Sequence, residues 1–207
     1  MSNFINLSKG ETISLTKMPA IDLSKGGKGL REVVVGLGWD PAMVEKKGIF
    51  GVRKVAGPSV DCDAFALLIK NGRLENSKDI IYFGNLRHSS NSIWHTGDNL
   101  TGDGDGDDEQ IIANLSKLNY DKVVIGVNIY NGKSKGQHFG MLQNAFVRIV
   151  DKENNQELCH YTLDSKYNGA VSIIFGELVR VGNDWDFRAV GETVNANTIG
   201  EVASFYK

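Results

Sequence analysis

An acidic stretch rich in glycine, from His95 to Glu109, offers the clearest chemistry in this sequence. It contains six carboxylates, those of Asp98, Asp103, Asp105, Asp107, Asp108 and Glu109. These charges repel one another, and the glycines disfavour helix and strand, so the stretch is costly to fold unless a cation neutralises it. Ca²⁺ is the best match, because it takes about six to eight oxygen ligands and glycines let backbone carbonyls turn inward. We therefore predict a calcium site, with a solvated acidic loop as the alternative.

The spacing of these acidic residues differs from that of an EF-hand. Counted from Asp103, the position that an EF-hand requires to be glycine is Asp108, and the position of its closing glutamate is Asn114. The ligands are therefore expected to come from several places in the chain. The candidates are Asp98, Asn99, Asp103, Asp105, Asp107, Asp108 and Glu109, with remote oxygens from Asp61, Asp63 and either Asp40 or Asn85. So many carboxylates allow one ion or two.

Asp61 and Asp63 stand at the upstream end of an apolar segment that reads as a strand and runs into an Asn-Gly turn. Side chains alternate along a strand, so both carboxylates are expected on one face and Cys62 on the other. Two carboxylates on one face favour a shared cation, while turn capping or pairing with nearby lysines is the alternative. We expect Cys62 to be a packed thiol, because a hard oxygen site has little use for sulfur.

Motifs for catalysis are absent from the sequence. It contains no Gly-x-Ser-x-Gly elbow, no Walker phosphate loop, no His-Glu-x-x-His pair and no Cys-x-x-Cys, and its histidines lack zinc-like spacing. His95 borders the acidic stretch, and we expect it to orient a carboxylate, with metal ligation or a role as a base as alternatives. The sequence thus predicts a protein that is not an enzyme, with a metal-dependent hydrolase as the second hypothesis.

The overall composition excludes several classes of protein. The 207 residues carry a formal net charge of −2, so there is no general basic field to attract nucleic acid. Two cysteines make no disulfide framework. No stretch approaches the ~20 apolar residues of a membrane span, and the first residues lack the pattern of a secretory signal. A soluble, cytoplasmic protein is expected.

The distribution of apolar residues predicts an all-β fold. Short β-rich segments recur at regular spacing, which is typical of a sandwich of two mostly antiparallel sheets, here with the acidic loop cluster at one end. We expect one domain over residues 1–207, two short edge strands between Leu7 and Gly26, and a turn or two of helix near Ile199 to Tyr206. The basic segment from Ala42 to Pro58 is interpreted as an inserted loop or short helix. The expected strands include Glu32–Asp40, Val60–Arg73 with its Asn-Gly turn, Asp79–Arg87, Ser92–His95, Gln110–Leu115, Lys122–Tyr130, Asn144–Val150, Leu158–Leu163, Ala170–Arg180 and Asp184–Val190.

Several motifs together resemble the tellurium-resistance stress-protein family, the TerD domain. They are Val-Gly-Leu-Gly-Trp-Asp-Pro at 35–41, Asp-Cys-Asp-Ala-Phe at 61–65, the stretch at 95–109, Asn-Ala-Phe-Val-Arg at 144–148 and Phe-Gly-Glu-Leu-Val-Arg at 175–180. The resemblance implies a cytoplasmic, calcium-binding β-sandwich of bacterial resistance operons, without established catalytic activity. It implies metal ligation at Asp61, Asp63, Asp98, Asn99 and 103–109, with Asp40 a weaker candidate. The chain departs from the family pattern in the longer 42–58 segment and in Cys62.

These observations lead to one expected function and two alternatives. We expect a calcium-binding stress protein that acts as a binding or scaffold module through other stress and tellurium-resistance proteins. Membrane association is expected only through such partners. The alternatives are the metal-dependent hydrolase and a calcium-dependent membrane module, for which the basic residues of 46–54 give slight support.

Overall fold

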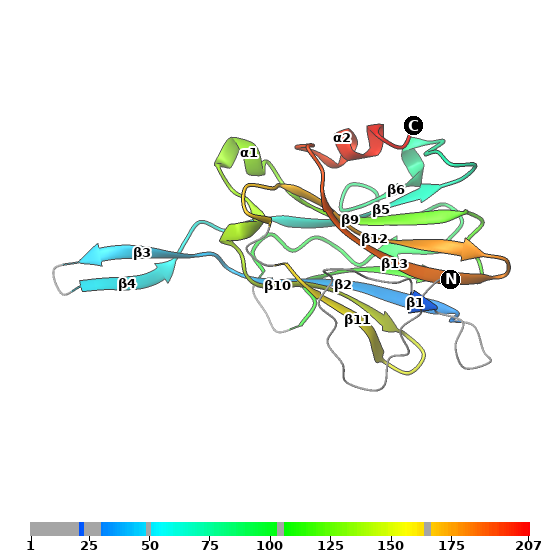
Figure 1. Ribbon diagram of the computed structural model, residues 1–207, viewed down its shortest axis with the longest axis horizontal. Helices are drawn as coiled ribbons and strands as arrows, with labels where there is room; N and C mark the ends of the chain where they lie inside the picture. Colours follow the sequence, from blue (N-terminus) through cyan, green and yellow to red (C-terminus); the bar gives the residue numbers. More distant parts are fainter. Residues whose placement is uncertain (1–20, 23–29, 49–50, 103–105, 164–166) are drawn as a thin grey trace, which may run out of the picture.

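The computed structural model describes residues 21–22, 30–48, 51–102, 106–163 and 167–207. Within these residues strands dominate, and two large antiparallel sheets stack face to face (Figure 1). This confirms the predicted all-β sandwich. Two edge strands were expected between Leu7 and Gly26, and most of that range lies outside the described residues. Within it, Ile21–Asp22 is described and forms the short strand β1.

One sheet has six strands in the order β1-β13-β12-β9-β5-β6, and the other has five in the order β11-β10-β2-β8-β7. Every pairing within these two sheets is antiparallel. Their longer strands coincide with most of the segments expected from sequence. The strands after β1 are β2 (Glu32–Asp40), β5 (Cys62–Ile69), β6 (Ile80–Ile81), β7 (Ile93–His95), β8 (Glu109–Asn114), β9 (Lys122–Ile129), β10 (Gln143–Asp151), β11 (Gln156–Thr162), β12 (Ser172–Val181) and β13 (Asp184–Thr193).

Alternation along β5 distributes its side chains between two apolar clusters. Cys62, Ala64, Ala66 and Leu68 belong to the core between the sheets. Phe65, Leu67 and Ile69 belong to a second cluster on the other face of the six-stranded sheet. Each large apolar side chain contributes about 1.5–3 kcal/mol when buried, so slipping this strand by one residue would be very costly. The packing therefore fixes Cys62 toward the core, as expected, and Asp63 toward the opposite face.

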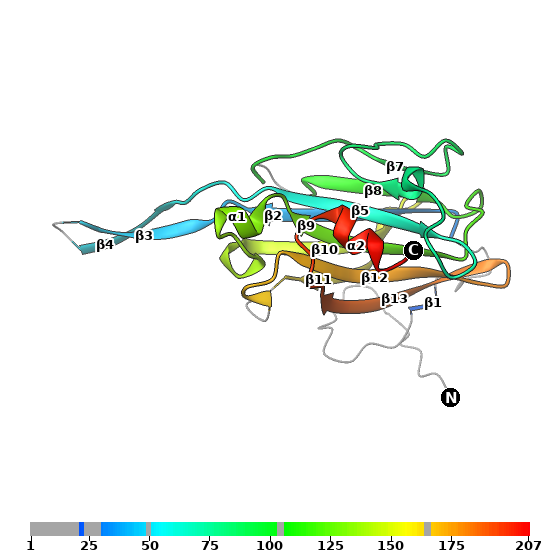
Figure 2. The same cartoon turned by 90° about the horizontal axis from the view of Figure 1, so that it is seen from above.

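A short helix near the C-terminus, α2 (Ile199–Ser204), covers the outer face of the six-stranded sheet and confirms the expected helix (Figure 2). The Thr198 side chain accepts a hydrogen bond from the Glu201 N–H and so caps its first turn. Val202 and Ala203 pack with Phe65 and Leu67. The other helical segments are α1 (Gly132–Lys135) and the 3-10 turns η1 (Ser77–Asp79) and η2 (Phe139–Met141). Within the described ranges, no helix has the length and apolar character needed to cross a membrane.

The segment from Ala42 to Pro58 is a β-hairpin, so its interpretation as a loop or short helix was wrong. Strands β3 (Met43–Gly48) and β4 (Gly51–Ala56) pair with each other and extend away from the sandwich (Figures 1 and 2). In the observed register Val44 lies opposite Val55, and Lys46 lies opposite Arg53. The β-branched residues of these strands, Val44, Val52 and Val55, stand among basic residues without a regular alternation, so the sequence pattern did not indicate strands.

The strand expected from Asp79 to Arg87 is also wrong for most of its length. Only Ile80–Ile81 forms a strand there, preceded by the 3-10 turn η1. The backbone then turns, with Tyr82 and Asn85 hydrogen bonded to each other through both N–H groups. Gly84 lies inside this turn and interrupts an otherwise β-like run of residues.

The expectation of a single domain over the whole chain stays a prediction.

Candidate metal centre

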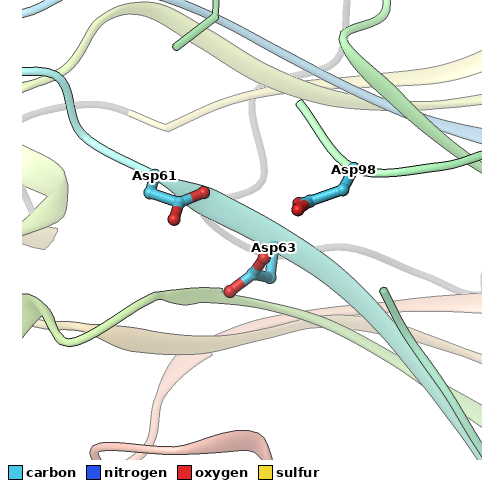
Figure 3. A group of neighbouring side chains, drawn as sticks. All are labelled: Asp61, Asp63 and Asp98. Atoms are coloured by element: carbon cyan, nitrogen blue, oxygen red, sulfur yellow. The ribbon is translucent and has the colours of Figure 1, made fainter. Parts of the chain in front are cut away.

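Three carboxylates from two distant parts of the chain meet at one end of the sandwich. Asp61 and Asp63 flank the first residue of β5, and Asp98 belongs to the loop between β7 and β8. Figure 3 shows the three side chains converging on one space. One oxygen from each carboxylate lies within 4.8 Å of the others. The structure thus brings together three of the predicted metal ligands.

These carboxylates lie in an environment that disfavours their negative charge. Burial and the nearby Asp98 carboxylate raise the pKa of Asp61 to about 6. Burial, followed by the charges of Asp61 and Glu109, raises the pKa of Asp63 to about 8. Lys135 acts in the opposite direction on both residues, but it does not cancel the effect. Without a cation, ionising both of these carboxylates at this end of the sandwich is therefore costly.

Two oxygens of the cluster are buried without a hydrogen bond. They are Oδ1 of Asp61 and Oδ2 of Asp63, for which the described residues supply no donor. The Asp63 residue is only 1% exposed. Buried polar atoms nearly always have a partner, and leaving one without it costs about 1–3 kcal/mol. A set of hard carboxylate oxygens in this state fits a hard cation such as Ca²⁺. Asp61, Asp63 and Asp98 would hold it.

Glu109, another predicted ligand, uses its carboxylate to join the two sheets. Its side chain is fully buried at the start of β8. Oε2 accepts the Ala64 N–H of β5 at 2.7 Å, and Oε1 accepts the Asn99 N–H at 3.2 Å. His95 Nδ1 accepts the Gly97 N–H, so its Nε2 carries the proton and donates to Glu109 at 3.3 Å. His95 thus orients a carboxylate, as expected from its position in the sequence.

Asp108 and Asn99 hold the acidic stretch against the end of β2. The backbone N–H of Trp39 donates to Asp108 Oδ2 at 2.9 Å, and the Asn99 side-chain amide donates to Asp108 Oδ1 at 2.9 Å. Asn99 Oδ1 in turn accepts the N–H groups of Thr101 and Gly102, both at 3.1 Å. These contacts occupy the polar atoms of both side chains with protein groups.

Asp107 points away from the three-carboxylate cluster and lies over the outer face of β2. Arg148 on β10 holds both of its oxygens, with Nε to Oδ1 at 2.7 Å and Nη2 to Oδ2 at 3.1 Å. The Gln110 amide donates to Oδ2 as well, at 2.9 Å. A Cβ atom at Gly36 would collide with the Asp107 carboxyl group, and one at Gly38 would collide with the Gly106 carbonyl. The Gly-x-Gly of β2 therefore leaves room for the acidic stretch to cross the sheet.

The remaining predicted ligands lie apart from the cluster or outside the described residues. The side chain of Asp40 accepts a hydrogen bond from Asn144 at 2.5 Å. The Asn85 side-chain amide donates to the carbonyls of Lys78 and Ile80 within its own turn. Asp103 and Asp105 lie outside the described residues. The predicted set thus divides into three carboxylates that converge and several residues whose oxygens bind protein donors.

Sequence reasoning missed the residues that position the acidic stretch. Arg148 lies 41 residues from Asp107 along the chain, and nothing local connects the two. The glycines of 35–41 were noted as part of a motif but not as a crossing point. Their alternation at Gly36 and Gly38, on a strand otherwise rich in valine, is the one local signal, because glycine within a strand often marks close backbone approach.

The sequence and structure have close counterparts among known proteins. Residues 5–206 match the TerD domain. The chain is 48% identical to stress response protein SCP2 of Bacillus subtilis (strain 168), over 94% of this chain and 98% of that protein. It is 43% identical to tellurium resistance protein TerX of Serratia marcescens, over 87% of this chain and 92% of that protein. A crystal structure of a homologue of telluride resistance protein (TerD) from Streptomyces coelicolor A3(2) superimposes with a TM-score of 0.67, at 21% identity, over 86% of this chain and 99% of that one. These relationships show that the chain belongs to the TerD-domain family of tellurium-resistance and stress-response proteins.

Proposed function

We propose that this protein is a cytoplasmic calcium-binding protein of the stress response, which acts as a binding module through partner proteins. The observation that carries the proposal is the convergence of Asp61, Asp63 and Asp98, with buried oxygens that lack a protein donor. Membership of the TerD-domain family supports the stress-response part. The relatives named for tellurium resistance or stress response make such proteins the natural class of partner.

The donor set of this centre favours binding over catalysis. Three carboxylates supply at most six oxygens, while Ca²⁺ takes about six to eight, so positions remain for water or for an acidic group of a partner. Both ring nitrogens of His95, the histidine next to the acidic stretch, are engaged by Glu109 and Gly97. His95 is therefore not placed to activate a water molecule. A bound ion that offers open positions to a partner's carboxylate would make association depend on calcium.

Calorimetric titration of metal-stripped protein tests the proposal. We expect Ca²⁺ to bind with a small whole-number stoichiometry and more tightly than Mg²⁺. Asp63→Asn is expected to weaken binding at least tenfold, because it removes a ligand charge from the centre. Asp184→Asn is the matched control, since Asp184 is the exposed first residue of β13.

The outcome of this titration separates the candidate functions. Preference for Mg²⁺ would favour metal-dependent hydrolysis over the proposed role. Absence of binding by either ion would refute the metal centre and leave an acidic surface. Equal weakening by Asp63→Asn and Asp184→Asn would show that general charge, not the Asp61–Asp63–Asp98 cluster, attracts the ion.

A further inference from the structure

The hairpin of β3 and β4 is an arm that projects from the sandwich where β2 ends and β5 begins (Figures 1 and 2). Its strands pair with each other and, as far as the structure describes the chain, with no strand of the two large sheets. A two-stranded hairpin without further packing is only marginally stable in water. Contact with another surface would therefore stabilise the arm.

The exposed side chains of the arm show which kind of surface that is. Directly paired residues share a face of the hairpin, so Lys46 and Arg53 lie on one face and Lys47 and Val52 on the other. All four residues are exposed, Val52 by 56%. Like charges directly opposite each other, as in Lys46 and Arg53, destabilise a hairpin. Contact with negative charge would remove this repulsion.

The basic character of the arm is local, and it occurs on both faces. The sequence from Lys46 to Lys54 reads Lys-Lys-Gly-Ile-Phe-Gly-Val-Arg-Lys, with four basic and no acidic residues, in a chain whose net charge is −2. A complementary protein patch would neutralise one face only. A layer of lipid headgroups surrounds a narrow arm and neutralises both, and its acyl region accepts an exposed valine.

We propose that the hairpin is a membrane-docking arm, whose Lys46, Lys47 and Arg53 bind anionic phospholipid headgroups while Val52 enters the apolar layer beneath them. This goes beyond the proposed calcium-dependent binding of proteins and does not depend on the metal centre. It also differs from the expectation that the protein reaches a membrane only through partners. The surface potential of anionic bilayers contributes about fivefold in affinity for each basic residue held near the headgroups.

Co-sedimentation with lipid vesicles tests the arm in the full-length protein. The vesicles contain either phosphatidylcholine alone or phosphatidylcholine with about one third phosphatidylglycerol, and each experiment is run in chelator and again with calcium. We expect binding to the anionic vesicles only, in chelator as well as in calcium, with loss of binding as salt is raised. The triple variant K46Q/K47Q/R53Q is expected to bind about 100-fold more weakly, because three contributions of about fivefold are removed.

A matched variant removes the same charge from the opposite end of the sandwich. R73Q/K78Q/K117Q changes three exposed basic residues beyond the far ends of β5 and β8 and should retain full binding. Melting curves show whether each variant is folded. Val52→Asp provides a second, single-residue test of the arm and is expected to reduce binding without changing the three basic side chains.

Four results would overturn the proposal. They are failure of the wild-type protein to bind anionic vesicles, unchanged binding by the folded K46Q/K47Q/R53Q variant, equal loss in R73Q/K78Q/K117Q, and binding that vanishes in chelator. If the wild-type protein instead formed a dimer that K46Q/K47Q/R53Q could not form, without binding vesicles, the arm would contact a second copy of the chain. Loss of calcium binding alone would refute the metal centre and leave the arm unaffected.

Discussion

Removing the charge of Asp63 should stabilise the metal-free protein and should reduce the stabilisation that calcium provides. In metal-free protein the Asp63 carboxyl has a pKa of about 8, against 3.8 for an ordinary aspartate. The folded state therefore holds this proton more tightly than the unfolded state. Stability from this group is complete below about pH 4 and is lost as the pH rises from about 4 to about 8.

The size of this effect follows from the distance between the pKa values and the working pH. At pH 7 the pH lies about three units above the pKa of the unfolded carboxyl. Keeping the proton in the folded state therefore costs about 4 kcal/mol of stability, at 1.36 kcal/mol per unit. Allowing for solvent screening halves the cost to about 2 kcal/mol. Asp63→Asn avoids it, so the metal-free variant should be more stable than the wild type by about 2 kcal/mol at pH 7 and by less than about 1 kcal/mol at pH 5.

Calcium should narrow the difference in stability between the two proteins. An ion at a hundred times its dissociation constant stabilises the wild type by about 2.7 kcal/mol, while a variant that binds it tenfold more weakly gains about 1.4 kcal/mol, so the advantage of Asp63→Asn should fall by about 1.3 kcal/mol. Urea unfolding of metal-stripped protein at pH 5 and pH 7, with and without calcium, measures the free energy of unfolding of both proteins under each condition. Asp184→Asn controls for general charge. A metal-free Asp63→Asn variant that is less stable than the wild type at pH 7, or whose advantage does not shrink at pH 5, would refute the raised pKa of Asp63.

Three further predictions concern the surroundings of the site. Gly36→Ala should lower the free energy of unfolding by about 1–3 kcal/mol, because the new methyl group collides with Asp107. Gly200→Ala, whose Cβ in α2 would meet only an ordinary contact with the Thr198 hydroxyl at 3.9 Å, should not, and equal urea midpoints of the two variants would contradict this account. Arg148→Met should cost about 2 kcal/mol by leaving the Asp107 carboxylate buried without its main partner, and adding Asp107→Leu should recover most of the loss in a double-mutant cycle. Burial raises the pKa of the Cys62 thiol well above its usual range and that of Cys159 to about 12. Neither thiol should therefore react with a disulfide reagent in the folded protein at pH 8, while both should react in urea; prompt labelling of the folded protein would contradict this expectation.

The sheet strands could be predicted from sequence because their side chains carry the signal themselves. The valines of β2 and the apolar run of β5 mark buried strands without reference to the rest of the chain. The hairpin was missed because Lys46, Lys47 and Arg53 interrupt its β-branched residues, and a strand that is exposed on both faces lacks an apolar alternation. The strand predicted at Asp79–Arg87 was wrong for the opposite reason, because its apolar residues suggest a strand that the turn at Gly84 prevents.

The candidate site could be predicted as a region but not as a set of ligands. Composition alone placed the negative charge in residues 95–109 and at Asp61 and Asp63. Which carboxylates meet depends on contacts between elements far apart in the sequence. Asp107, Asp108 and Glu109 are consecutive, yet they bind Arg148, Trp39 and Ala64 on three different strands. No local pattern distinguishes them from Asp98, whose side chain meets Asp61 and Asp63 instead.

This division of roles explains how so many carboxylates are tolerated in one place. Glu109 and Asp108 bind backbone N–H groups, and Asp107 binds Arg148, so their charges are stabilised without any ion. They also hold the acidic stretch against both sheets, which keeps Asp98 close to Asp61 and Asp63 despite their mutual repulsion. Burial and these neighbouring charges leave the cluster strained in the metal-free state. A cation that entered the cluster would relieve this repulsion with little rearrangement, so the fixed carboxylates around it would increase the affinity of the proposed metal centre.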